Sequence, residues 1–252
     1  MTCLFMPMKL VRVICVISAL AGWLTLTSQP LRAEADAFAD QLLDGVRLST
    51  VLQGDKDMQG RLSKKGKNTR VSLFMRGKDI QFQYEDKVWH KFHMRLRDDK
   101  AELFTLDEAG KTKRFDDKRL AEPVAGTDLT YEDLSFRFLY WPNAKVIGRD
   151  KIKGQWCHKL SVQNPDRKGA YALCHIWIDE KHNAMMQVVG FDSKGRPLKR
   201  FKVDSIMKVG KAYTLKEMHV ETVDPATNRV TGMTKLRFNE AKEVKPAGRG
   251  GL

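Results

Sequence analysis

Short runs in which apolar and polar residues alternate make up most of this 252-residue chain, and such runs predict β-strands. The first group lies between Met58 and Phe115 and comprises 69–75, 79–85, 87–97, 101–106 and 111–115. The second group comprises 145–152, 155–162, 170–177, 184–192, 197–209, 212–223 and 229–238. Only short turns separate the runs within each group, so we expect neighbouring strands to pair as an antiparallel meander.

Two segments have helical periodicity instead. Apolar residues recur every three or four positions between Glu34 and Gln53, which predicts an amphipathic helix whose acidic start suits the helix dipole. A second helix is predicted to begin after Thr130, an N-cap with Asp133 three residues later, and to end before Pro142. Its apolar stripe would comprise Tyr131, Leu134, Phe138 and Trp141.

These elements predict a mainly β fold with some α: one large antiparallel sheet of about ten strands and two helices to cover one face. A sheet this wide must curl or close. If the helices lie over its concave face as a lid, an apolar cavity lies beneath them. Its candidate lining residues are Phe38, Leu42, Val46, Tyr131, Leu134, Phe138 and Trp141 on the helices, and Phe74, Trp89 and Phe92 on the strands. Each could equally be ordinary core, and only an open concave face would make them a site.

The first 33 residues predict a secretory signal peptide. Lys9 and Arg12 precede an uncharged run over 13–27, and the small residues that follow place the cleavage after Ala33. A membrane anchor needs roughly 20 apolar residues, and this run is shorter. We therefore expect a periplasmic protein in which 34–241 form one domain and 242–252, rich in Gly, Pro and charge, form a flexible tail.

The chain is strongly basic, with 45 Lys and Arg against 31 Asp and Glu and a formal charge of +14. Removal of the signal, which holds three basic residues and no acids, leaves 14 − 3 = +11. Such a charge suggests nucleic acid in a cytoplasmic protein, but export argues against that partner. Anionic lipid headgroups or acidic partners are the better targets, and a solvated lysine-rich surface is an equal alternative.

Two cysteines remain after processing, Cys157 and Cys174, on predicted strands that flank the turn-rich stretch 164–169. A hairpin symmetric about position 165.5 pairs them, since 157 + 174 = 331, and an oxidising compartment then favours a disulfide. A metal site formed with His158 and His175 is the alternative. Adjacent residues of a strand point to opposite faces, so a cysteine and the histidine beside it cannot readily bind one ion, and we expect no metal. We expect no other cofactor either.

The sequence lacks the common hydrolase motifs, Gly-x-Ser-x-Gly and His-Glu-x-x-His, and its six histidines have no ligand spacing. We therefore predict no enzymatic activity. Glu132 and Asp133 beside Tyr131 could form a functional cluster. The alternative is that these carboxylates complement the dipole of the helix that begins there.

Two stretches resemble the outer-membrane lipoprotein-sorting family, the LolA/LolB-like fold: Gly126–Leu134, which reads GTDLTYEDL, and Val188–Arg200, a strand, a turn and a following basic strand. The similarity runs from about Leu43 to Ala241. The resemblance implies a half-open β-barrel of about 10–11 strands with helices as a lid over a cavity that accepts acyl chains.

By this resemblance the chain would be a monomeric lipid or lipoprotein carrier in outer-membrane lipoprotein sorting. Its partners would be lipoprotein acyl chains or lipid, together with an inner-membrane transporter. The functional basic residue of the family's carriers matches no single position here. The alternative function is a non-enzymatic interaction module, either a lipoprotein sensor or an accessory to a membrane transporter of the resistance-nodulation-division type.

Overall fold

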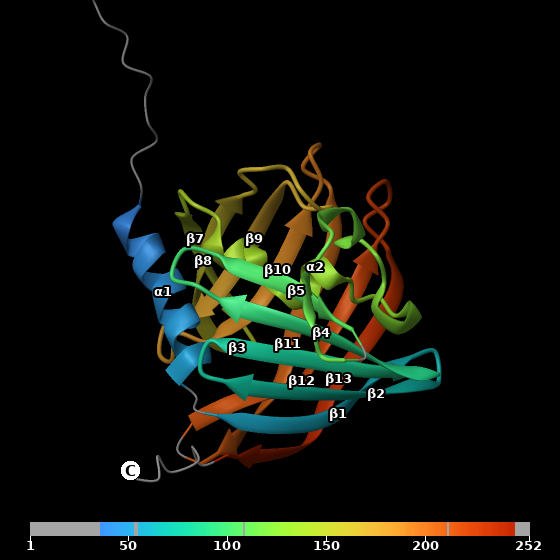
Figure 1. Cartoon of the computed structure of the whole chain (residues 1–252). Helices are drawn as coiled ribbons and strands as arrows, with labels where there is room; N and C mark the ends of the chain where they lie inside the picture. The colour runs from blue at the N-terminus through green and yellow to red at the C-terminus, as the bar shows by residue number, and fades with distance from the viewer. Residues whose placement is uncertain (1–35, 53–54, 108, 211, 245–252) are drawn as a thin grey trace, which may run out of the picture. The chain divides into compact units, whose positions relative to one another are not determined.

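The computed structural model describes residues 36–52, 55–107, 109–210 and 212–244. Within these residues, thirteen strands form one antiparallel sheet in the order β6-β5-β4-β3-β2-β1-β13-β12-β11-β10-β9-β8-β7 (Figure 1). The strands are β1 Lys56–Lys64, β2 Lys67–Arg76, β3 Asp79–Asp86, β4 Val88–Leu96, β5 Ala101–Leu106, β6 Thr112–Arg114, β7 Lys145–Ile152, β8 Gln155–Gln163, β9 Leu173–Asp179, β10 Met185–Phe191, β11 Pro197–Val209, β12 Ala212–Val223 and β13 Val230–Glu243.

The sheet confirms the predicted fold class. The strands of each group pair with their neighbours in sequence, and the pairing of β1 with β13 joins the two groups. Thirteen strands exceed the expected ten to eleven. Among them, β1 has a weak pattern because only Met58 and Leu62 are apolar on its buried face. Gly60 stands between them at a bulge, where a side chain would overlap the backbone of Arg237 on β13.

Helix α1, Ala37–Leu52, agrees with the prediction, but the second helix is much shorter than expected. α2 covers only Tyr131–Ser135 and ends at Phe136, which adopts a left-handed conformation with φ 47°. A 3₁₀ turn, η3 Arg137–Tyr140, follows, so the prediction of one helix up to Trp141 is wrong. The start was predicted correctly: Asp133 N–H donates to Thr130 Oγ1 (3.3 Å) and Thr130 N–H to Asp133 Oδ2 (2.7 Å).

The sheet curves around α2, which lies between its two halves (Figure 1). Tyr131 of α2 contacts Tyr84 of β3, and Asp133 of α2 contacts Lys199 of β11. Four strands separate β3 from β11 in the sheet order, namely β2, β1, β13 and β12. A helix of five residues can reach both only if the sheet bends around it.

One apolar cluster fills the inside of this curve. It takes side chains from the inner faces of both halves of the sheet, from α2 and from η3. α1 adds its own apolar stripe, Ala39, Leu42, Leu43 and Val46, and contacts β7 and η3. This helix therefore covers apolar interior, as the prediction of a helical lid requires.

The predicted disulfide between Cys157 and Cys174 is wrong, because both thiols are free. Cys157 lies opposite Asp179, and Cys174 lies opposite Val162. Paired numbers therefore sum to 157 + 179 = 336 rather than 331. An odd shift moves one cysteine to the other face of the sheet, and the two thiols accordingly belong to different apolar clusters.

The register differs because residues 170–172, predicted as strand, extend the loop instead. Asn164 Nδ2 donates to the carbonyls of Lys168 (2.8 Å) and Tyr171 (2.7 Å), which closes the loop around its side chain. Ala170 N–H donates to Glu132 Oε2 (2.7 Å) rather than to β8. A contact with a segment almost forty residues away therefore decides the register of this hairpin.

The predicted signal peptide, 1–33, lies outside the described residues, as do positions 245–252 of the predicted tail. β13 continues to Glu243, which pairs with Lys56, so the sheet extends two residues past the expected boundary at 241. Among the described helices, none has the length and apolar character needed to span a membrane.

Candidate functional site

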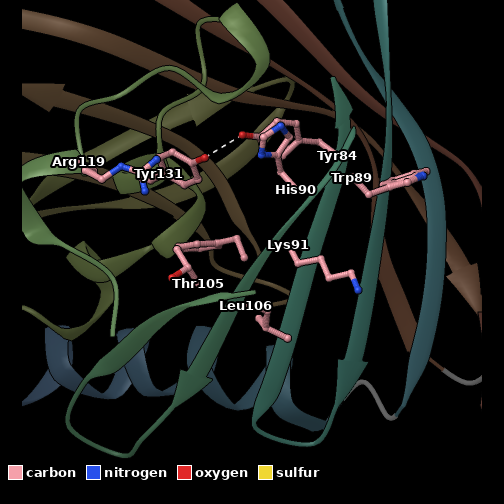
Figure 2. Close-up of a pocket in the computed structure, with 9 residues that line it drawn as sticks. Tyr84, Trp89, His90, Lys91, Thr105, Leu106, Arg119 and Tyr131 are labelled. Carbon is pink, nitrogen blue, oxygen red and sulfur yellow. Dashed lines mark hydrogen bonds between the residues drawn. The ribbon is translucent and has the colours of Figure 1, made fainter. Parts of the chain in front are cut away.

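A pocket of about 150 Å³ opens on the inner side of the sheet, between β3, β4, β5 and the segment that leads into α2 (Figure 2). Its lining residues are Tyr84, Trp89, His90, Lys91, Phe92, Thr105, Leu106, Arg119 and Tyr131. Strand alternation explains part of the set, because Tyr84, His90, Phe92 and Thr105 occupy inward positions that pair across three adjacent strands, whereas Trp89 and Lys91 are the alternate positions of β4.

Aromatic rings form the inner wall of the pocket. The His90 ring stacks on Tyr84 with centroids 4.7 Å apart, and the Phe92 ring lies 5.4 Å from that of Tyr131. The hydroxyls of Tyr84 and Tyr131 share a hydrogen bond of 2.8 Å (Figure 2). Burial, aided by this hydrogen bond, raises the pKa of Tyr84, so its hydroxyl stays neutral. The inner wall is therefore aromatic, with one internally satisfied polar pair, and Lys91, Thr105 and Arg119 add polar groups to the rest of the lining.

A cation lies beside this wall. The Arg119 guanidinium lies 5.5 Å from the centre of the Phe115 ring and 5.7 Å from that of Tyr131. Its Nε donates to Glu122 Oε2 (2.9 Å), and this bond raises the pKa of Arg119. Aromatic rings with a fixed cation beside them suit an amphiphilic molecule, whose apolar part would contact the rings and whose polar end would lie near the cation.

The structure divides the ten predicted lining residues into three groups. Trp89, Phe92 and Tyr131 line the pocket. Leu42, Val46, Leu134, Phe138 and Trp141 are buried in the main apolar cluster away from the pocket. Phe38 and Phe74 face elsewhere. Phe38 is 47% exposed on α1, and Phe74 points to the outer face of β2, whereas its neighbour Met75 points to the inner face.

Side chains fill the space beneath α1. Leu42, Leu43 and Val46 are buried in one cluster with Phe138. The pocket of about 150 Å³ is smaller than the roughly 300 Å³ at which ligand pockets usually begin. In this conformation the pocket has room for a small group only, and a longer ligand would require α1 or the α2 segment to move.

Three buried carboxylates hold the GTDLTYEDL segment inside the sheet, and the first is Asp128. Its Oδ1 accepts from Thr222 Oγ1 (2.8 Å) on β12 and its Oδ2 from Thr234 Oγ1 (2.7 Å) on β13, while Lys64 Nζ of β1 lies 3.2 Å away. Burial by itself raises the pKa of Asp128. The hydrogen bonds from Thr234 and Thr222, together with Lys64, outweigh burial, and the pKa lies below its usual value.

The other two carboxylates are adjacent in α2. Asp133 accepts from Lys199 Nζ (2.6 Å) and Tyr171 Oη (2.5 Å), so it links α2 to β11 and to the β8–β9 loop. Glu132 accepts from Ala170 N–H through one oxygen only. Its other oxygen is buried without a hydrogen-bond partner among the described residues. Burial, the main cause, raises the pKa of Glu132 to about 7.

These contacts connect the two stretches that carry the family resemblance. Lys199 of the second stretch pairs with Asp133 of the first. Tyr171, bound to Asp133, lies over Gly190, where a Cβ would come within 2.5 Å of its ring. Glu132 and Asp133 are thus buried anchors, a role that neither sequence hypothesis included, and they position Tyr131 in the pocket wall.

Sequence reasoning missed Tyr84, His90 and Arg119 as pocket residues. The alternation in β3 and β4 places Tyr84 and His90 on the inner face, but nothing local shows that these positions meet α2. Arg119 comes from a short 3₁₀ turn, η1 Asp117–Arg119, in a segment without periodicity. Its place beside Tyr131 depends on the folding of the whole segment.

Comparison with known proteins agrees with this architecture. A family model described as "Uncharacterized protein" matches residues 80–244, more than half of the chain, whereas none of the curated proteins matches. Three solved structures share the fold. A domain assigned to outer-membrane lipoprotein sorting from Vibrio parahaemolyticus has TM-score 0.66 and 16% identity, over 86% of this chain and 94% of that one. A DUF1329 family protein from Desulfovibrio piger has TM-score 0.64 and 16% identity, over 85% and 94%.

The third, a LolA superfamily protein from Nitrosomonas europaea, has TM-score 0.61 and 12% identity, over 82% of this chain and 94% of that one. At these identities the likeness establishes the fold, and the family model establishes membership. The chain belongs to the family that this model describes, and its fold is the LolA/LolB-like fold of the outer-membrane lipoprotein-sorting proteins.

Proposed function

We propose that this chain is a periplasmic carrier that shelters the acyl chains of lipid or of lipoproteins inside its curved sheet, in outer-membrane lipoprotein sorting. One observation carries the proposal: the aromatic pocket directly borders the main apolar cluster. Phe92 and Tyr131 line the pocket and also belong to that cluster. An apolar chain that enters the pocket therefore meets apolar interior beyond it.

The energy for binding would come from removing methylene groups from water, at about 0.8 kcal/mol each. Only a chain end fits in about 150 Å³, so deeper entry requires displaced side chains. α1 is suited to move because the hydrogen bonds seen between its described residues and the rest of the chain are few. Arg47 Nε donates to the Leu139 carbonyl (2.7 Å), and Asp36 accepts from Val146 N–H (3.0 Å).

Movement of α1 would exchange one apolar contact for another. Its stripe, Leu42, Leu43 and Val46, would leave the cluster while acyl methylenes took its place. The free energy of opening is then largely recovered on binding, as in other lid motions that are coupled to a ligand. The polar end of the cargo would remain near Arg119.

A fluorescent fatty acid tests the proposal. The purified protein should take it up, and native mass spectrometry should detect lipid that co-purifies after gentle extraction. Thr105→Trp, on the inner face of β5, should fill the pocket and weaken uptake at least about tenfold, since it blocks the contact of several methylenes. Thr231→Trp makes the same substitution at an exposed position of β13, away from the pocket, and should leave uptake unchanged.

Two results would count against the carrier. The first is the absence of both uptake and co-purified lipid, which would leave the interior as an ordinary core. The second is equal uptake by the Thr105→Trp and Thr231→Trp proteins, which would place the fatty acid outside the pocket.

A further inference from the structure

The β7–β8 hairpin forms one free edge of the sheet and is strongly basic. β7 is the last strand of the order, and the turn Lys153-Gly154 joins it to β8. Residues 145–163 contain five Lys or Arg and one Asp, so their formal charge is 5 − 1 = +4. Among the described residues, three carboxylates from elsewhere accept hydrogen bonds from this hairpin: Glu180 from Arg149 (2.5 and 2.7 Å), Asp204 from Lys153 (2.9 Å) and Asp36 from Val146 N–H (3.0 Å). The local balance stays positive, at 4 − 3 = +1.

An exposed tryptophan lies among these cations. Trp156 is 51% exposed, and its ring centre lies 5.1 Å from Arg149 Cζ and 5.9 Å from Lys151 Nζ. Lys151 pairs directly with Trp156 across the two strands, and Arg149 pairs with His158. These four side chains therefore share one face of the hairpin.

A second aromatic ring extends this face toward α1. Phe38, which was predicted to line the cavity, instead sets its ring edge-on against His158, with centroids 5.0 Å apart, and is 47% exposed. Glu180 lies 3.7 Å from His158 as well. We call Phe38, Arg149, Lys151, Trp156 and His158 the β7–β8 patch.

Protection of the sheet edge does not account for the whole patch. Charged residues on an edge strand discourage pairing with another sheet, and this explains the lysines and arginines of β7. It does not explain the exposed Trp156 of the neighbouring strand β8, nor Ile147 of β7, which is 46% exposed. Large apolar side chains on an edge strand would favour the association that the charges oppose.

Cations and exposed apolar side chains occur together where a protein meets a charged bilayer. Tryptophan prefers the headgroup level of a membrane, and lysine and arginine are attracted by anionic headgroups. A nucleic acid fits less well, because the Trp156 ring already has two cations against it and Ile147 offers nothing to a base. We propose that the β7–β8 patch docks this protein on the surface of an anionic phospholipid bilayer, independently of any acyl chain held inside.

Vesicle binding tests the docking surface. The full chain is expressed, and the purified protein is sedimented with vesicles of phosphatidylcholine containing phosphatidylglycerol, and with vesicles of phosphatidylcholine alone. Wild-type protein should prefer the anionic vesicles, and added salt should weaken that preference. The double variant Arg149→Gln with Lys151→Gln should lose about tenfold in binding because two cations leave the surface. Trp156→Ser should also bind more weakly, and salt should change its binding as it does that of the wild type.

Matched controls come from other strands. Lys235→Gln with Arg237→Gln removes two cations from the outer side of β13, and Tyr213→Ser removes an aromatic ring that is 61% exposed. Both should bind vesicles like the wild type, and thermal melting should show that every variant is folded. The proposal is overturned if the patch variants bind as the wild type does, if the controls lose as much, or if the patch captures an acidic protein but no vesicles. Fatty acid uptake should be unchanged in the patch variants, so this surface and the carrier function can fail separately.

Discussion

Glu132→Gln should stabilise the protein at alkaline pH and leave its stability unchanged in acid. The side chain is 2% exposed, and one of its oxygens accepts from Ala170 N–H. The other oxygen is buried without a partner in the described part of the chain. Burial raises the pKa of this carboxyl from its usual 4.5 to about 7. Glutamine keeps the shape and the acceptor but cannot ionise.

The magnitude follows from the shift in pKa. A shift from 4.5 to about 7 corresponds to roughly 3 kcal/mol, at about 1.4 kcal/mol per pH unit. Between these two values the folded protein binds more protons at this site than the unfolded chain, so stability falls as the pH rises. The contribution of Glu132 is complete below pH 4.5 and is lost as the pH passes 7. At about pH 8 the variant should therefore be more stable by up to about 3 kcal/mol.

Urea unfolding, followed by tryptophan fluorescence at a series of pH values from about 5 to about 8, measures this difference. The two proteins should agree at the acid end and diverge steadily above it. Glu122→Gln removes an exposed carboxylate from the segment before α2 and is the control, which should keep the slope of the wild type. Parallel profiles for the wild type and Glu132→Gln would refute the assignment of a costly buried charge to Glu132.

Three further predictions concern the contacts that hold α2. Gly190→Ala should lower the free energy of unfolding by about 1–3 kcal/mol, because the added Cβ would overlap the Tyr171 ring. The urea midpoint measures this loss, and an unchanged midpoint would show that the ring moves freely. Lys199→Met should lower the free energy of unfolding by about 3–5 kcal/mol, because Asp133 would be left buried without its cation. Adding Asp133→Asn to this variant should recover part of the loss in the same assay. Tyr84→Phe should cost about 1 kcal/mol, seen as a lower melting temperature, since it removes a buried hydrogen bond.

Local chemistry in the sequence was sufficient for much of the fold. Alternating runs predicted the meander, and the Thr130 and Asp133 pair predicted the start of α2, because a strand pairs with its neighbour and a capping box closes within four residues. The end of that helix was not predictable in the same way. Phe136 takes a left-handed conformation, and no glycine or proline marks this position in the sequence.

The predicted register of β8 and β9 was wrong for a related reason. A symmetric hairpin placed Cys157 opposite Cys174, but Ala170 and Tyr171 leave the ladder to bind Glu132 and Asp133. The same long-range contacts decide the pocket, because they position the α2 segment against β3 and β4. Sequence alternation can assign a side chain to a face of the sheet, but it cannot show which distant segment meets that face.

The GTDLTYEDL segment gains a structural role from these contacts. Its Asp128 and Asp133 bind β11, β12 and β13 of one half of the sheet, and Asp128 also pairs with Lys64 of β1, while Tyr131 between them contacts β3 and β4 of the other half. The buried acids thus fix the distance between the two halves of the sheet beside the pocket. A ligand that entered beside Tyr131 would push on a segment whose other side is tied by buried ion pairs and hydrogen bonds. Since the described residues of α1 show few such ties, the inner space should open by displacement of α1 while the α2 segment stays in place.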